Sequence, residues 1–209
     1  MVEWYTCDGV QKMNSFRNQY IVIKMEDEYY DLIQKQLEQA RAIDRNNKPI
    51  EDYQDSKVEG LDHKEGSYDE VNRSSKSRFI DDERLYGLVD GFARFANSKA
   101  EWNYDIDFIE PIQDTLYEVG GYYDWHIDES NWYPGKRQSN RIRKISFTIL
   151  LNDDFEGGEF ELFADEKKII PLEKKDVILF MGDTPHRVRK VTSGVRKSLV
   201  GWVQGPAYK

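Results

Sequence analysis

The chain has 209 residues, a length that suits one domain with a substantial core. Its 39 acidic side chains outnumber the 30 basic ones, and the net charge of -9 opposes general binding to nucleic-acid phosphates. The single cysteine cannot form an internal disulfide, and no apolar run is long enough to span a membrane. Because the N-terminus also lacks the pattern of a signal peptide, we expect a soluble, cytoplasmic protein.

Residues 1–100 are predicted to form a helical support. Apolar side chains recur at helical spacing over residues 29–43 and again over residues 85–96. Asp81 or Asp82 is available to cap the second helix. Stripes of this kind are typical of helices that pack on a sheet, so we assign them no chemistry.

Between the two helices, residues 44–75 are polar and contain few apolar anchors. Such a stretch cannot bury much surface, which predicts a long loop that is either a functional lid or disordered. His63 lies in this loop without a companion ligand nearby, and we interpret it as a solvated side chain.

After residue 100 the apolar pattern changes to a period of two, as expected for strands. Turn-forming residues separate these segments at short intervals. The predicted strands are residues 145–149, 159–163, 168–172, 176–181, 188–192 and 196–203. Helices first and strands afterwards predict an α+β domain, with the helices packed on one sheet of a sandwich or jelly roll.

Two of the three histidines lie where a metal site would need them. In an extended segment His126 and Asp128 project from the same face, so both can approach one ion. His186 follows a strand and a turn, and a barrel can bring that strand end beside the first pair. Two imidazoles and one carboxylate form the 2-His-1-carboxylate triad, which holds iron and leaves coordination positions open. The short motif is weak alone, because it arises by chance in many chains.

Arg196 begins an alternating strand, and it shares a face with Ser198, Val200 and Trp202. The apolar members indicate that this face looks into the core, where an unpaired guanidinium is costly. Its partner could be a protein carboxylate, or the side chain could lie at an exposed strand end. A cosubstrate carboxylate is the third alternative, and the hydroxyl of Tyr117 could contact the same group.

Three motifs together resemble the prolyl 4-hydroxylase-like branch of the iron(II)- and 2-oxoglutarate-dependent oxygenases. The resemblance covers roughly residues 75–205. Its motifs are the segment 117–128 with its glycine pair Gly120-Gly121, the turn Gly157-Gly158-Glu159, and Pro185-His186 followed by Gly194-Val195-Arg196. The fold that it implies is a double-stranded β-helix, with its core at about 101–205 in a single domain of residues 1–209.

The resemblance also implies roles for individual residues. His126, Asp128 and His186 would bind Fe(II), while Arg196, helped by Tyr117, would bind the distal carboxylate of 2-oxoglutarate. The implied reaction uses O2, releases succinate and CO2, and takes ascorbate as its reductant. A carboxylate at Asp128 favours hydroxylation, because halogenating relatives lack it. Collagen-type prolyl hydroxylases usually place Lys where this chain has Arg196. Either cation can hold a carboxylate, so the departure leaves the implied cosubstrate intact but weakens the implied prolyl substrate.

Residues 129–143 follow Asp128 directly and combine aromatic, flexible and basic side chains. Trp132, Tyr133 and Arg137 are the candidate substrate contacts of a lid, although a solvated basic loop is the alternative. The predicted function is therefore hydroxylation of a peptidyl residue, with proline the best guess.

Two other functions remain open at this stage. One is hydroxylation of a free amino acid or another small metabolite. The other is a non-catalytic β-barrel that binds a metal or a ligand. An open triad together with Arg196 favours catalysis over the second, because structural zinc sites tend to be closed by four protein ligands.

Overall fold

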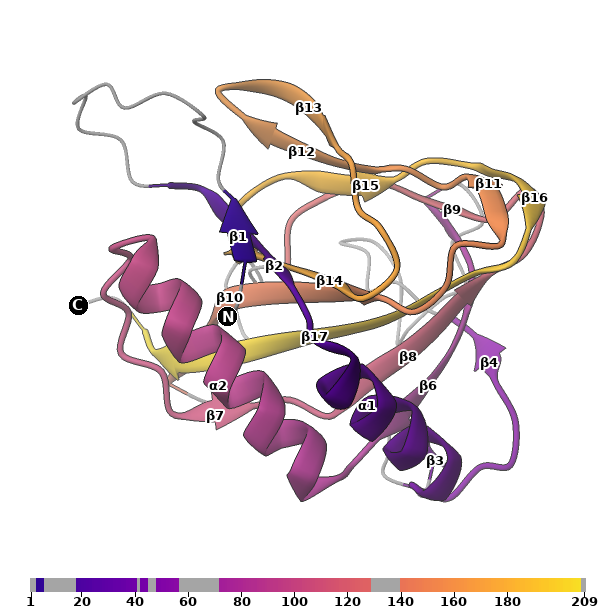
Figure 1. The fold of residues 1–209 in the computed structure, drawn as a ribbon, viewed down its shortest axis with the longest axis horizontal. Coiled ribbons are helices and arrows are strands. Elements are labelled where there is room, and N and C mark those ends of the chain that lie inside the picture. The colour runs from indigo at the N-terminus through magenta and orange to yellow at the C-terminus, as the bar shows by residue number, and fades with distance from the viewer. Residues whose placement is uncertain are drawn as a thin grey trace.

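The computed structural model describes residues 3–5, 18–40, 42–44, 48–56, 72–128 and 140–207. Two antiparallel sheets pack face to face, and two helices cover the outer face of the larger sheet (Figure 1). The helices of this described part are too short or too polar to cross a membrane. The predicted α+β architecture, with helices packed on one sheet, is confirmed.

The larger sheet contains strands from both halves of the chain. In spatial order they are β1 (Glu3–Tyr5), β2 (Tyr20–Lys24), β14 (Asp176–Met181), β10 (Arg141–Leu150), β17 (Arg196–Pro206), β8 (Ile112–Tyr117), β6 (Lys76–Ile80) and β3 (Ala42–Ile43). Two short strands extend it, β4 (Gln54–Asp55) on β6 and β7 (Phe108–Ile109) on β17.

The smaller sheet has five strands. In spatial order they are β13 (Glu166–Ile170), β12 (Phe160–Ala164), β15 (His186–Val188), β9 (Tyr122–His126) and β5 (Arg73–Ser74). A separate pair, β11 (Phe155–Gly157) and β16 (Val191–Gly194), lies at one end of the two sheets (Figure 1).

The helices are α1 (Asp27–Gln39) and α2 (Glu83–Lys99). Asp82 caps α2, because its carboxylate accepts hydrogen bonds from the backbone N–H groups of Arg84 and Leu85 at 3.0 and 3.1 Å. The predicted extension of the first helix to residue 43 is wrong. The chain becomes extended at Ala40, and Ala42–Ile43 instead pairs with β6, which satisfies its backbone groups at the sheet edge.

The expectation of a helical first half is also wrong in part, because β2 and β6 lie there and join the larger sheet. In β2 the residues Tyr20 to Ile23 are all buried, so the strand shows no alternation to reveal it. The region 44–75 is not wholly loop either, since it contributes β4 and β5 and buries Ser56 and Arg73. His63 lies outside the described residues.

The strands predicted after residue 100 are present, and β14 has the predicted bounds 176–181. One expected strand, residues 188–192, is instead divided between β15 and β16, which belong to different sheets. The division leaves His186 at the start of β15, in the smaller sheet, which faces the larger sheet.

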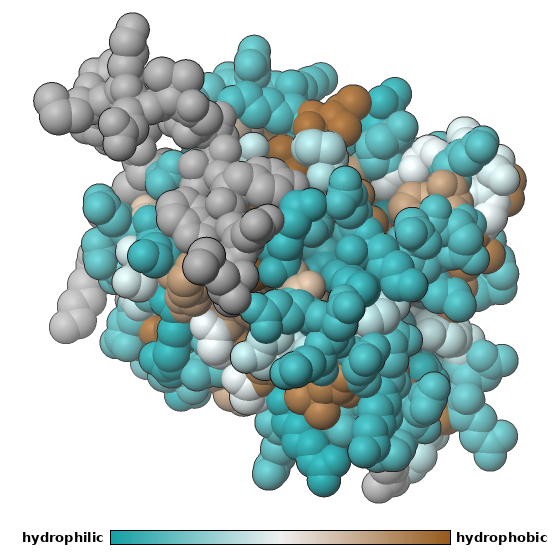
Figure 2. Space-filling view, in the orientation of Figure 1, coloured by the Kyte–Doolittle hydropathy of each residue, from teal (hydrophilic) through white to brown (hydrophobic). Residues whose placement is uncertain are grey.

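The larger sheet is buried on both faces and therefore has two apolar cores. Ile145, Phe147 and Ile149 of β10 face the helices, whereas Phe180 and Phe160 pack between the two sheets. The surface seen in Figure 2 is mostly hydrophilic, with apolar side chains only in separate small spots. The space between the two sheets is thus one of two dry interiors in the described part of the chain.

Candidate metal centre and cosubstrate pocket

The two predicted histidine ligands lie opposite each other on neighbouring strands of the smaller sheet. His126 at the end of β9 is the cross-strand partner of His186 at the start of β15, and their ring centroids are 4.1 Å apart. Asp128 lies just beyond β9, where its backbone N–H donates to the carbonyl of Gly182 at 3.1 Å. The structure thus brings together all three residues that the sequence singled out.

The donor atoms of this triad are close enough to share one ion. All three ligand atoms lie within 4.8 Å of one another. Nε2 of His126 is 3.8 Å from Oδ1 of Asp128, and Nε2 of His186 is 3.4 Å from Oδ2. The other ring nitrogens contact backbone carbonyls, at 2.7 Å for Asp124 and 2.9 Å for Thr184. Because a carbonyl only accepts, each Nδ1 carries the proton, and each Nε2 lone pair is free for a metal.

The electrostatics favour the protonation states that bind metal. Burial and the neighbouring His186 lower the pKa of His126 to about 3, despite the opposing effect of Asp128. Burial alone would raise the pKa of Asp128, but the charges of His186, His126 and Arg143 outweigh it and lower that pKa to about 2. Near pH 7 His126 therefore offers a neutral imidazole and Asp128 an ionised carboxylate.

One carboxylate oxygen of the cluster accepts no hydrogen bond from the described residues. Oδ2 of Asp128 is fully buried and has no hydrogen-bond partner in the described part of the chain. A buried carboxylate oxygen without a donor is costly, and a divalent cation held by the two imidazoles would satisfy it. The donor set and its geometry therefore fit a metal ion such as iron.

Aromatic rings fix the orientation of both imidazoles. Tyr123 stacks on His126 with centroids 3.5 Å apart and an interplanar angle of 15°. Phe180 and Phe160 contact the His186 ring at 4.6 and 5.8 Å. Tyr123 was not among the predicted site residues, although its position in the segment 117–128, three residues before His126, places it close to the metal ligands.

Arg196 lies inside the protein, as its strand pattern predicted. Its residue is 1% exposed, its guanidinium donates to Oγ of Ser198 at 3.0 Å, and it lies 5.7 Å from the ring of Tyr117, its cross-strand partner. Burial lowers the pKa of Arg196, with Tyr117 acting in the opposite direction. Among the described residues no carboxylate forms an ion pair with it, so the protein-carboxylate alternative loses its support.

The glycine turn of the sequence motif makes room for this arginine. A Cβ atom on Gly158 would lie 2.9 Å from Cδ of Arg196, and the residue has a φ of +64°. Gly121 has a similar constraint, because a Cβ atom there would lie 2.8 Å from the carbonyl oxygen of Glu118. The close backbone approach expected at the glycine pair is therefore present at Gly121.

The basic segment after Asp128 is only partly described. Trp132, Tyr133 and Arg137, the predicted substrate contacts, lie outside the described residues. Arg143 does not belong to a solvated loop. It lies in β10, donates two 2.6 Å hydrogen bonds to Glu110, and packs over Trp202 at 3.8 Å.

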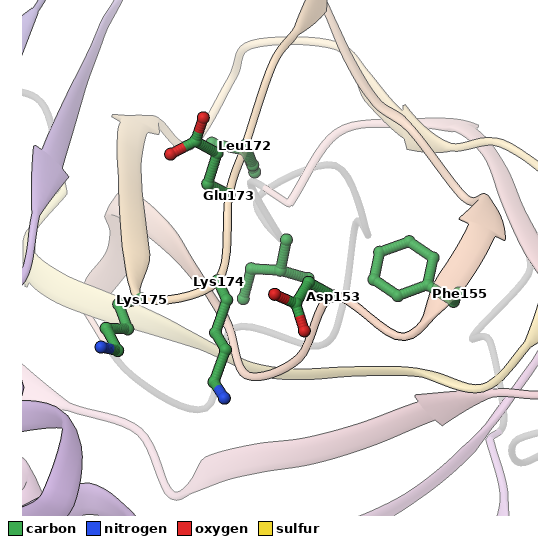
Figure 3. A pocket seen from close by; sticks show the side chains of 7 residues that line it. Asp153, Phe155, Leu172, Glu173, Lys174 and Lys175 are labelled. Atoms are coloured by element: carbon green, nitrogen blue, oxygen red, sulfur yellow. The ribbon is translucent and has the colours of Figure 1, made fainter.

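Two surface hollows lie away from the triad. One, of about 530 Å³, has Phe155 and Asp153 on one side and residues 172–175 on the other (Figure 3). A second, of about 490 Å³, lies between α1 and the outer face of β6 and β8. Neither is lined by a triad residue, so we assign neither to the metal chemistry.

Comparison with known proteins addresses the same region. Residues 112–204 match the family model described as the 2OG-Fe(II) oxygenase superfamily. A PKHD-type hydroxylase of Gloeothece citriformis is 42% identical over 94 residues, which are 43% of this chain and 40% of that protein. The match therefore spans well under half of the relative's length.

Solved structures resemble the chain over a longer span. A viral collagen prolyl hydroxylase from Paramecium Bursaria Chlorella virus-1, solved as a 2OG complex, gives a TM-score of 0.60 at 18% identity, covering 90% of this chain and 97% of that one. A prolyl hydroxylase from Trichoplax adhaerens, in complex with a hypoxia inducible factor peptide fragment, gives 0.57 at 18% identity, with 88% and 83% covered. These likenesses confirm the double-stranded β-helix fold. The region around the triad is therefore similar to the 2OG-Fe(II) oxygenases of the prolyl 4-hydroxylase-like branch in its motifs, in its family match and in its fold. This is the similarity that the sequence predicted.

Proposed function

We propose that this protein is an Fe(II)- and 2-oxoglutarate-dependent dioxygenase that hydroxylates a peptidyl residue, with proline as the preferred residue. The proposal depends on one observation: a set of iron-binding side chains and a buried arginine both lie in the space between the two sheets. The triad at His126, Asp128 and His186 has the donor set of an iron site, and Arg196 is a buried cation that no carboxylate of the described residues pairs with. A structural metal site would need no such cation.

In this proposal each residue has a defined task. His126, Asp128 and His186 would hold Fe(II), and Arg196 would bind the distal carboxylate of 2-oxoglutarate, with Tyr117 beside it. When bound, the iron with 2-oxoglutarate and O2 supplies the oxidising chemistry, yielding succinate, CO2 and a hydroxylated substrate. The rings of Tyr123, Phe160 and Phe180 fix the imidazoles and keep water from the centre.

The similarity to prolyl hydroxylases supports the choice of substrate. The solved relative from Trichoplax adhaerens holds a peptide fragment, and the curated relative is named a PKHD-type hydroxylase. We extend both to this chain as part of the proposal, together with ascorbate as the reductant and a cytoplasmic location.

The test combines turnover with metal binding. Purified protein, supplied with Fe(II), ascorbate and 2-oxoglutarate, should produce succinate, and a proline-containing peptide library should gain one oxygen atom by mass spectrometry. His186→Ala should abolish iron binding, measured by calorimetry, as well as succinate formation, because two ligands cannot hold the ion in this geometry. If the protein bound iron but formed no succinate with any peptide, the dioxygenase proposal would be wrong, and the non-catalytic metal-binding β-barrel would remain.

A further inference from the structure

A second buried guanidinium lies beside the triad, and the proposed mechanism does not use it. Arg73 is 6% exposed and belongs to β5, the edge strand next to β9. Its guanidinium carbon lies 4.6 Å from the ring centroid of Tyr123, its cross-strand partner. The same ring stacks on His126. The cation is therefore separated from a proposed iron ligand by one aromatic ring.

Arg73 is poorly satisfied for a buried cation. Among the described residues its guanidinium donates one hydrogen bond, from Nε to Oγ of Ser75 at 2.7 Å, and forms no ion pair. A guanidinium has five N–H donors, so most of its capacity remains available. Burying it without an anion is costly, as it is for Arg196. By contrast, Arg143 has the carboxylate of Glu110.

The wall beside Arg73 is polar over a considerable distance. Ser75 Oγ is 2.9 Å from Ser56 Oγ, which is 2.9 Å from Ser77 Oγ. Ser77 is paired in register with Thr115 of β8, whose Oγ1 is buried without a partner. Thr115 in turn pairs with Ser198, the residue that contacts Arg196. Small hydroxyl side chains therefore lie on successive strands between Arg73 and Arg196, and hydrogen bonds join those of Ser75, Ser56 and Ser77.

We propose that Arg73 forms an anion subsite, which binds a carboxylate carried by the peptide next to the residue that is hydroxylated. The inference rests on the proposed function and narrows its substrate class to peptides with Asp or Glu adjacent to the target proline. A planar guanidinium matches a carboxylate through two parallel hydrogen bonds. The net charge of -9 gives the chain no overall attraction for an acidic peptide, so a local cation would have to supply it.

The experiment compares two peptides that differ only in Glu or Gln beside the proline. For the unaltered protein, kcat/KM for the Glu peptide should exceed that for the Gln peptide by about 10- to 100-fold, the range of a hydrogen-bonded charge pair. Arg73→Met retains an apolar stem against Tyr123 but removes the charge, and the preference should disappear. Arg73→Lys retains the charge without the fork, and should keep part of the preference.

Arg187→Met is the matched control. Arg187 follows His186 directly and also lies over an aromatic ring, that of Trp125 at 4.9 Å. It is, however, paired with Glu161 on the opposite face of the smaller sheet from the triad. Its loss should leave the Glu preference unchanged. Thermal unfolding of each variant verifies that a folded protein is being compared.

Calorimetry of both peptides, without 2-oxoglutarate, measures their affinity separately from turnover. Tighter binding of the Glu peptide, lost in Arg73→Met, supports the subsite. Equal behaviour of the two peptides with the unaltered protein, or a preference that survives in Arg73→Met, would overturn it. Absence of succinate under every condition would instead contradict the proposed function, while the affinity comparison would still decide the anion subsite.

Discussion

Arg196 begins β17, whereas Arg143 of the neighbouring strand β10 pairs with Gln204 near the other end of β17, and the surroundings of the two arginines differ in one respect. Arg143 packs on Trp202 and shares two 2.6 Å hydrogen bonds with Glu110. Arg196 is buried more deeply but contacts only a hydroxyl and an aromatic ring among the described residues. Burial of a cation does not by itself indicate ligand binding. A counter-charge missing from the described surroundings is the more informative observation, because a bound anion would offset the cost of burial.

The largest expected effect comes from Arg196→Met. We expect the KM for 2-oxoglutarate to rise about 100-fold, since a charged hydrogen-bonded pair is lost. The free energy of unfolding without ligand should rise by about 1 kcal/mol, because an unpaired buried cation is replaced by an apolar chain of similar length. Thermal unfolding and succinate assays measure the two effects.

The stability change should have the opposite sign for Arg143 of β10. Arg143→Met would leave Glu110 without its cation and should lower the melting temperature, whereas Arg196→Met should not. If both variants lost stability equally, Arg196 would be a structural residue and the contrast between the two arginines would be wrong.

Glu110→Gln removes the carboxylate that pairs with Arg143. Because both partners are about one-fifth exposed, we expect a loss of about 2 kcal/mol of stability, below the value for a fully buried pair. Arg143 also donates to the carbonyl of Asp128 at 3.4 Å, so iron affinity should fall about 10-fold. Urea unfolding and iron calorimetry measure these effects.

Asp107→Asn is the control for this change. Asp107 pairs with Arg141 of the same strand, but both side chains are well exposed. Its loss should therefore cost less than about 0.5 kcal/mol and leave iron affinity unaltered. An equally large loss in both variants would show that exposure does not control the strength of these pairs.

Gly158→Ala tests the space around the unpaired arginine. A Cβ atom there would lie 2.9 Å from Cδ of Arg196, and the positive φ adds strain. We expect the guanidinium to shift and the KM for 2-oxoglutarate to rise about 10-fold, with a loss of about 1 kcal/mol in stability. Gly87→Ala in α2, where a Cβ atom meets nothing, should leave the KM unchanged.

Tyr117→Phe should have the smallest effect. The ring remains beside Arg196, and only the hydroxyl is removed. We expect the KM for 2-oxoglutarate to rise about 3- to 10-fold, the value of one ordinary hydrogen bond. A KM equal to that of the unaltered protein would remove Tyr117 from the cosubstrate pocket while leaving the assignment of Arg196 intact.

The strand periodicity after residue 100 was readable because half-buried strands alternate, and β14 was predicted with its observed bounds. The strand β2 was missed because both of its faces are covered, which removes the alternation. The residues of β3 continued an apolar helical pattern, yet pairing with β6 made them a strand. Local pattern cannot report a hydrogen-bonding partner that lies far away in the chain.

The sequence by itself determined which side chains could form the triad, since histidine is scarce and the spacing from His126 to Asp128 is short. It also predicted that Arg196 would face the interior. Only the tertiary structure decided that Arg143 has a carboxylate partner while Arg196 has none in the described part of the chain, and that Arg73 and His126 both contact the ring of Tyr123. These facts depend on which strands become neighbours, and strand pairing is set by contacts between distant segments rather than by any local pattern.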